Sequence, residues 1–106
     1  MSQEIVRKGG EGFYFCDNSI VVPVQNVWTA IPFIDSAEGA TFRAVRLYVR
    51  NRETQGAEYI DYSFDGGTTL AGRVHANGTM DDFSDGFTAL HIRISGATTA
   101  FSLYVR

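Results

Sequence analysis

The sequence predicts an all-β protein: an antiparallel β-sandwich of about eight short strands, folding as a single domain over residues 1–106. Three observations favour this fold. Aromatic residues make up 13% of the chain, and aromatic side chains are enriched in strands. Eleven Gly against two Pro indicate many tight turns. Short apolar runs follow one another closely without helical periodicity, which favours antiparallel pairing, in a jelly-roll-like sandwich or, alternatively, a small β-barrel.

In the N-terminal half, the expected strands are short and separated by turn residues. They cover residues 3–8, 13–16, 19–24 and 27–33. Asp17 and Asn18 are typical turn residues between the second and the third strand, and Pro32 places the end of the fourth at a sheet edge. Residues 35–39 are loop-like.

Residues 41–50 alternate most regularly and predict a strand with two different faces. The face expected to point inward carries Arg43, Val45, Leu47 and Val49. The face expected to point outward carries Phe42, Ala44, Arg46, Tyr48 and Arg50. A polar loop is expected at residues 51–57.

The C-terminal half predicts two hairpins and two inward rows. Strands at 58–64 and 70–76 are joined by a DGG turn, and Asn77-Gly78 is the strongest short hairpin signal in the chain. Residues 81–86 are expected to form an acidic loop. The side chains expected to face inward are Ile60, Tyr62, Phe64, Leu70, Val74, Thr88, Leu90, Ile92, Ile94, Phe101, Leu103 and Val105.

The stretch YSFDGGTTL, residues 62–70, fits the pattern S-x-D-x-G-x-T-W of the Asp box found in sialidases and related β-propellers, except that Leu70 stands in the Trp position. A propeller needs at least four blades of four strands, which 106 residues cannot supply. Asp65 can instead accept backbone N–H groups, while Gly66 and Gly67 tolerate positive φ. We interpret the motif as a turn.

Other chemistry-bearing residues do not predict an enzyme, a cofactor or a metal site. Asp81, Asp82 and Asp85 lack the ligand spacing of a calcium loop. His75 and His91 are expected on outward faces, and no Ser or Cys has a recognisable nucleophile setting. Cys16 lies on an aromatic strand, where an inert, partly buried thiol is expected, and a lone cysteine cannot form an internal disulfide.

Arginine is the most informative residue type. Eight Arg occur against one Lys, and Phe42, Arg46, Tyr48 and Arg50 share the expected outward face of the strand at 41–50. Arg and Tyr are enriched at protein interfaces, where Lys is depleted. These four residues are therefore the candidate protein interface, with a plain solvated face as the alternative.

Charge and hydropathy exclude several classes of partner. The net charge of −3 argues against a general nucleic-acid binder. No apolar run approaches the length of a membrane span, and the first residues do not form a secretory signal. These features are those expected of a protein made in a reducing cytoplasm.

Residues 58–106 resemble small bacteriophage virion proteins. The resemblance is carried by YSFDGGTTL, by a second hairpin at HANGT, and by ALHIRISGATTAFSLYVR at the end of the chain. Leu70 departs from the commoner DGGTTW form. The resemblance implies a non-enzymatic virion component: a head decoration (cement) protein, or a head–tail or tail component. It also implies a homo-oligomer, by analogy a trimer, that binds a major capsid or other virion protein.

A second class of function is a carbohydrate-binding or receptor-binding module. Trp28, Tyr48 and Tyr59 are its candidate stacking platforms. Such a site needs two or more coplanar exposed aromatic rings. A cement protein is expected to sediment with assembled heads, whereas a lectin is expected to bind a glycan array as an isolated domain.

Overall fold

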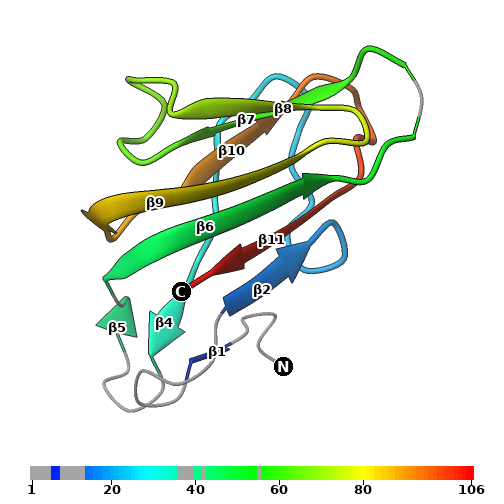
Figure 1. The fold of residues 1–106 in the computed structure, drawn as a ribbon. Coiled ribbons are helices and arrows are strands. Elements are labelled where there is room, and N and C mark those ends of the chain that lie inside the picture. The colour runs from blue at the N-terminus through cyan, green and yellow to red at the C-terminus, as the bar shows by residue number, and fades with distance from the viewer. Residues whose placement is uncertain (1–5, 8–13, 36–39, 42, 55) are drawn as a thin grey trace.

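A computed structural model describes residues 6–7, 14–35, 40–41, 43–54 and 56–106. Every regular element among these residues is a strand, and the fold is the β-sandwich that the sequence predicts. Two four-stranded antiparallel sheets pack against each other, and a small third sheet lies at one end (Figure 1). None of the described residues belongs to a helix with the length and apolar character needed to cross a membrane.

The first sheet has the strand order β2-β11-β6-β9. Its strands are β2 (Tyr14–Asp17), β11 (Phe101–Val105), β6 (Ala44–Asn51) and β9 (Thr79–Phe87). The second sheet has the order β3-β10-β7-β8. Its strands are β3 (Thr29–Ala30), β10 (His91–Ile94), β7 (Tyr59–Ser63) and β8 (Gly72–His75).

The third sheet has the order β1-β4-β5 and consists of two-residue strands. These are β1 (Val6–Arg7), β4 (Ile34–Asp35) and β5 (Ala40–Thr41), with β1 parallel to β4. The strand expected at 3–8 is described only as β1. Residues 36–39 of the expected loop lie outside the described residues.

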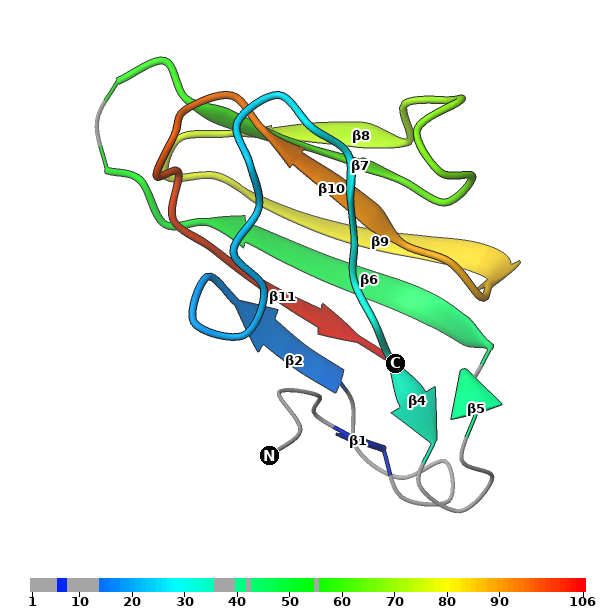
Figure 2. The same cartoon turned by 180° about the vertical axis from the view of Figure 1, so that it is seen from behind.

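Both open sides of the sandwich are closed by connections between the sheets. On one side, β8 and β9 are joined by a turn at Asn77-Gly78: Asn77 has a φ of 60°, and the N–H of Gly78 donates to the carbonyl of His75 over 2.9 Å. The turn forms where the sequence predicts it, but the predicted hairpin was wrong, because β8 pairs with β7 and β9 pairs with β6 in the other sheet. On the other side, the connection from β2 to β4 runs past β10, drawn in cyan in Figure 2. There the N–H of Ile31 donates to the carbonyl of Leu90 over 2.9 Å.

The core lies between the inward faces of the two sheets, and most of the predicted inward rows are confirmed. The buried members of those rows are Leu47, Val49, Ile60, Tyr62, Val74, Leu90, Ile92, Ile94, Phe101, Leu103 and Val105. Aromatic rings fill one part of this core: the ring of Phe87 lies 4.4 Å from that of Phe64 and 5.9 Å from that of Phe33, between ring centroids. Leu70 and Thr88 are exposed, so their inward placement was wrong.

A bulge in β6 overturns part of the predicted alternation at 41–50. The N–H groups of Val45 and Arg46 both donate to the carbonyl of Arg106, over 2.8 and 3.0 Å. The extra residue shifts the side chains that precede it to the other face. Ala44 is therefore buried, whereas Val45 is 49% exposed and Arg43 is exposed, and the predicted faces of these three residues were wrong.

The strand expected at 19–24 is absent from the described structure. Its first N–H groups donate hydrogen bonds to Asp17 instead of to a neighbouring strand. The carbonyl of Asp17 accepts from the N–H groups of Ile20 and Val21 over 3.0 Å each, and its carboxylate accepts from the N–H of Ser19 over 2.8 Å. These bonds turn the chain at the end of β2. The strand expected at 27–33 is reduced to β3.

The acidic loop expected at 81–86 is instead part of β9. In the register with β6, Asp81 lies opposite Tyr48 and Asp82 lies opposite Leu47. Asp81 pairs with Arg46, and Asp82 accepts a hydrogen bond from the hydroxyl of Tyr62 over 2.9 Å. Pairing of this acidic segment with β6 is possible because both carboxylates have partners. β9 is also an edge strand, and charged side chains on an edge strand discourage edge-to-edge aggregation.

Candidate functional site

Three aromatic side chains form a row across the outer face of the first sheet. Tyr104 on β11 lies opposite Phe15 on β2 and opposite Tyr48 on β6. The ring centroids are 5.0 Å apart for Phe15 and Tyr104, and 5.9 Å apart for Tyr48 and Tyr104. All three side chains are half-buried. We call Phe15, Tyr104 and Tyr48 the aromatic row.

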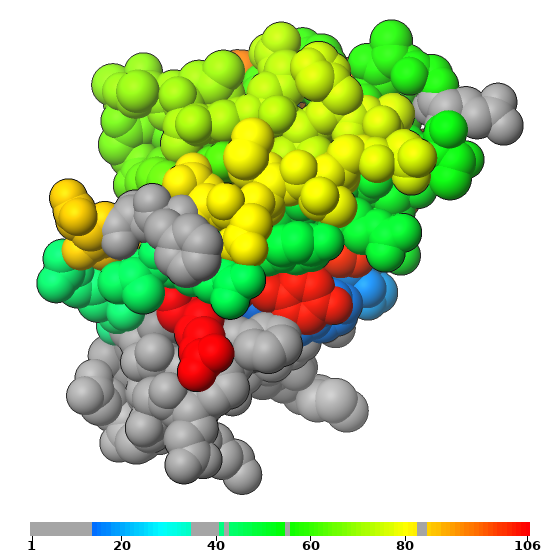
Figure 3. Space-filling view, in the orientation of Figure 1, coloured from blue at the N-terminus to red at the C-terminus, as the bar shows by residue number. Residues whose placement is uncertain are grey.

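Arginine flanks this row. Arg46 forms a two-point ion pair with Asp81, with its Nε donating to Oδ1 over 2.9 Å and its Nη2 donating to Oδ2 over 2.7 Å. The hydrogen bond and the charge of Arg46 lower the pKa of Asp81. Arg46, Tyr48, Tyr104 and Arg106 line a groove of about 360 Å³. Figure 3 shows the C-terminal residues, in red, at the surface below the green of β6.

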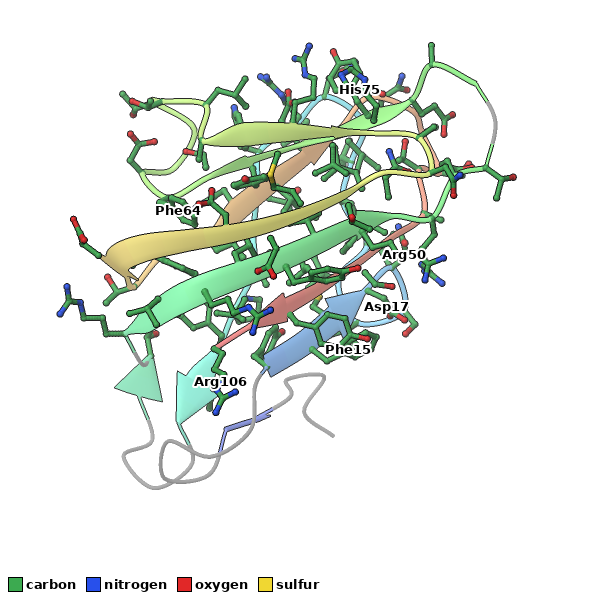
Figure 4. The ribbon with its side chains drawn as sticks, in the orientation of Figure 1. Phe15, Asp17, Arg50, Phe64, His75 and Arg106 are labelled. Atoms are coloured by element: carbon green, nitrogen blue, oxygen red, sulfur yellow. The ribbon has the colours of Figure 1, made fainter. Side chains whose placement is uncertain are left out.

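The structure brings together only some of the candidate interface residues. Arg46 and Tyr48 both lie at the groove. Arg50 is exposed in the next row of the sheet, where it lies opposite Ser102. Phe42 lies outside the described residues. Figure 4 shows Arg50 and Arg106 at opposite ends of this face, with Phe15 between them.

Sequence reasoning missed the groove residues contributed by other strands. Tyr104 alternates with the inward Leu103 and Val105, so its outward direction was available from the pattern. Its position beside Tyr48 was not, because that depends on the pairing of β11 with β6. Phe15 carried the same alternation signal, between the buried Tyr14 and Cys16.

The outer face of the second sheet carries an ionic cluster that the sequence did not indicate. Asp61 on β7 lies opposite Arg93 on β10 and opposite Arg73 on β8. Its side chain is 0% exposed, and both arginines contact its carboxylate, at 2.7 Å for Arg73 and 2.8 Å for Arg93. Burial raises the pKa of Asp61, but the hydrogen bonds from Arg73 and Arg93 outweigh it, so the pKa lies below its usual value. We call Arg93, Asp61 and Arg73 the Arg–Asp–Arg rung.

The candidate sugar-stacking residues do not form a coplanar platform. Tyr48 is tilted by 56° against Tyr104. The guanidinium of Arg93 lies 4.4 Å from the ring centroid of Trp28, and that of Arg73 lies 3.8 Å from the ring centroid of Tyr59. One face of each of these two rings is thus already covered. The geometry does not favour a carbohydrate site.

The SFDGG segment forms a tight turn whose hydrogen bonds are internal. Oδ1 of Asp65 accepts from the hydroxyl of Ser63 over 2.6 Å and from the N–H of Thr69 over 2.8 Å. These bonds lower the pKa of Asp65 to about 2. The hydroxyl of Ser63 also accepts from the N–H of Gly67 over 3.0 Å. The Asp-box residues hold the turn together, as the turn interpretation predicts.

Gly67 gives a test of this turn. Its φ is +97°, and an added Cβ would lie 2.6–2.7 Å from ring atoms of Trp28. Gly67→Ala should therefore lower the free energy of unfolding by about 2–4 kcal/mol, from backbone strain and overpacking together. Gly66→Ala is the matched control: Gly66 has a φ of +74° with no atom within 4 Å of the added Cβ, so only about 1–2 kcal/mol is expected. Equal losses in urea denaturation would contradict the contact with Trp28.

The other chemistry-bearing residues lie apart. The described residues contain no group of three or more His, Cys, Asp or Glu side chains able to hold a metal ion. His75 is exposed and packs edge-on against Tyr59, with 6.3 Å between ring centroids, whereas His91 is half-buried. Cys16 is buried, and burial raises the pKa of its thiol to about 11. The thiol is more deeply buried than the sequence suggested.

Lowered aspartate pKa values predict acid sensitivity. The pKa values of Asp17, Asp61, Asp65 and Asp81 all lie below the usual value for an aspartate. A carboxyl with a depressed folded-state pKa stabilises the fold above its unfolded pKa, and this contribution is lost as the pH falls through the folded value. The melting temperature should change little between pH 7 and 5 and should fall steeply below about pH 4. A melting temperature that stays constant down to pH 2 would contradict these assignments.

The two outer faces therefore differ in chemistry. The first presents the aromatic row and a groove flanked by Arg46 and Arg106. The second presents the Arg–Asp–Arg rung, held against Trp28 and Tyr59. No family model, curated protein sequence or solved structure matches this chain.

Proposed function

We propose that this protein is a non-enzymatic structural protein of a bacteriophage virion, and specifically a head decoration protein that binds the outer capsid surface. The observation that carries the proposal is the aromatic row with its arginine-flanked groove. Tyr48 and Tyr104 place two large, partly buried rings beside Arg46 and Arg106 on an otherwise regular sheet face. Tyr and Arg are the side chains that most often contribute large binding energies at the centre of protein interfaces.

The proposed mechanism is stabilisation of the assembled capsid by a protein that binds only the assembled form. A protein that binds the assembled lattice, but not the separate capsid subunits, stabilises the lattice by mass action. The aromatic row would be covered at the junction between neighbouring capsid subunits. A rigid sheet suits this role, because little conformational entropy is lost when pre-ordered side chains are covered.

The class of particle comes from the resemblance of residues 58–106 to small phage virion proteins. Of the two segments that carry much of this resemblance, SFDGG joins the paired strands β7 and β8, and HANGT forms a turn that links the two sheets. The same resemblance gives the expected state of the protein as a homo-oligomer, a trimer by analogy, with a major capsid protein as its partner.

Mass spectrometry of purified virions, with head and tail fractions separated, tests the proposal. The protein is expected in the head fraction in many copies per particle, and the isolated protein should sediment with undecorated heads. Recovery only with tails would replace decoration by a tail or head–tail role. Absence from virions, together with retention of the isolated domain on a glycan array, would overturn the proposal in favour of a carbohydrate-binding module.

A further inference from the structure

The Arg–Asp–Arg rung holds more positive charge than its own carboxylate balances. Asp61 accepts from Arg73 through Nε over 2.7 Å and Nη2 over 3.1 Å, and from Arg93 through Nη2 over 2.8 Å. Two guanidinium groups thus share one carboxylate, which leaves a local charge of +1 (two positive, one negative). The chain as a whole carries −3. One arginine would have sufficed to neutralise Asp61.

Both guanidinium groups are held in position by contacts within the protein itself. Arg73 lies over Tyr59 and Arg93 lies over Trp28, at 3.8 and 4.4 Å from the ring centroids. Their side chains are still 39% and 33% exposed. Among the described residues, Nη1 of Arg73 and both Nε and Nη1 of Arg93 donate no hydrogen bond. Pre-ordered donors lose little side-chain entropy when they bind.

We propose that Arg73 and Arg93 together bind one carboxylate of an acidic segment in a partner protein. A single carboxylate brings one negative charge, which balances the local +1. The flanking Tyr59 and Trp28 are side chains enriched at protein interfaces. A polyanion such as nucleic acid matches this surface less well, because the chain as a whole is acidic.

This site lies on the sheet opposite to the one that carries the aromatic row. Figure 4 shows His75, which marks the second sheet, at the far side of the sandwich from Phe15 and Arg106. Carboxylate binding at this site is therefore separate from capsid binding by the aromatic row, and the protein would have two binding faces. A two-faced protein can link two partners, or two copies of one partner, across its own thickness.

The test follows the side-chain Nε–Hε signals of the arginines by NMR while a hexaglutamate peptide is added to the wild-type protein. The signals of Arg73 and Arg93 should shift saturably and together. Arg50, exposed on the opposite sheet, is the internal control and should not shift saturably. In the variant Arg73→Lys with Arg93→Lys, charge balance at Asp61 is kept while the planar donors are lost, and the peptide affinity should fall about tenfold. Arg50→Lys should leave it unchanged.

Three results would overturn the assignment: no saturable shift in the wild-type protein, an equal shift at Arg50, or tighter binding of sulfate, phosphate or a single-stranded oligonucleotide than of hexaglutamate. The wild-type titration decides the question even if the lysine variant does not fold. The proposed function can fail separately, because peptide binding at this site needs neither the aromatic row nor a phage particle.

Discussion

Replacing both Arg73 and Arg93 by methionine should lower the free energy of unfolding by about 3–5 kcal/mol relative to the wild-type protein. The reason is the carboxylate that remains: Asp61 is 0% exposed, and its carboxylate accepts hydrogen bonds from these two arginines. A buried charge that loses its partners carries a penalty of about this size. Urea denaturation followed by circular dichroism measures the change, with the midpoint and the slope both recorded.

The control is the same double variant with Asp61→Asn added. Neutralising the carboxylate removes the unpaired charge, so the triple variant should recover a large part of the lost stability. An amide at this position still needs hydrogen bonds, so recovery is not expected to be complete. If the triple variant were as unstable as the double one, the loss would come from packing against Tyr59 and Trp28 rather than from Asp61.

Replacing Tyr48 and Tyr104 by alanine should abolish most of the protein's association while leaving the monomer folded. Both side chains lie on the outer face, half-buried, and the core residues between the sheets are untouched. Truncation of central interface tyrosines commonly costs about 2 kcal/mol or more each, so the pair should weaken binding by roughly a thousandfold where the two losses add. Light scattering reports the oligomeric state, and sedimentation with undecorated heads reports binding.

Arg46 is left unchanged in this variant for a structural reason. Arg46→Glu would place two carboxylates together at Asp81, and any loss of binding would then be confounded with repulsion inside the monomer. Leu70→Ala is the control variant, because Leu70 is 47% exposed and lies outside both sheets. It should keep the native mass and full head binding. An equal loss of binding in both variants would point to a general effect on folding.

The fold and the C-terminal half were accessible from the sequence because period-two alternation and turn chemistry agree there. Ile92 and Ile94, like Leu103 and Val105, alternate cleanly, and each row is buried as expected. The turn at Asn77-Gly78 forms because Asn tolerates the positive φ that the turn needs, although it links two sheets and does not close a hairpin. Arg46 and Tyr48 were placed correctly on the outer face for the same reason.

The errors arose where long-range pairing or local hydrogen bonds override alternation. The bulge at Val45 depends on the carbonyl of Arg106, more than fifty residues away in the sequence. The sequence predicts a loop at 81–86 because the partners of its carboxylates lie on other strands: Arg46 forms an ion pair with Asp81, and the hydroxyl of Tyr62 donates a hydrogen bond to Asp82. The Arg–Asp–Arg rung was missed because its three residues come together only through the pairing register of β10, β7 and β8, which the sequence pattern does not reveal.

Covering of the aromatic row in the assembled particle is the central claim, and hydroxyl-radical footprinting of Tyr48 and Tyr104 tests it most directly. The two tyrosines are modified in the free protein and in purified particles, and the extents are compared by mass spectrometry. The proposed function predicts that both tyrosines are strongly protected in the particle. Equal modification of Tyr48 and Tyr104 in the free and the particle-bound protein would show that this face stays open to solvent, and would contradict the assignment of the groove as the docking surface.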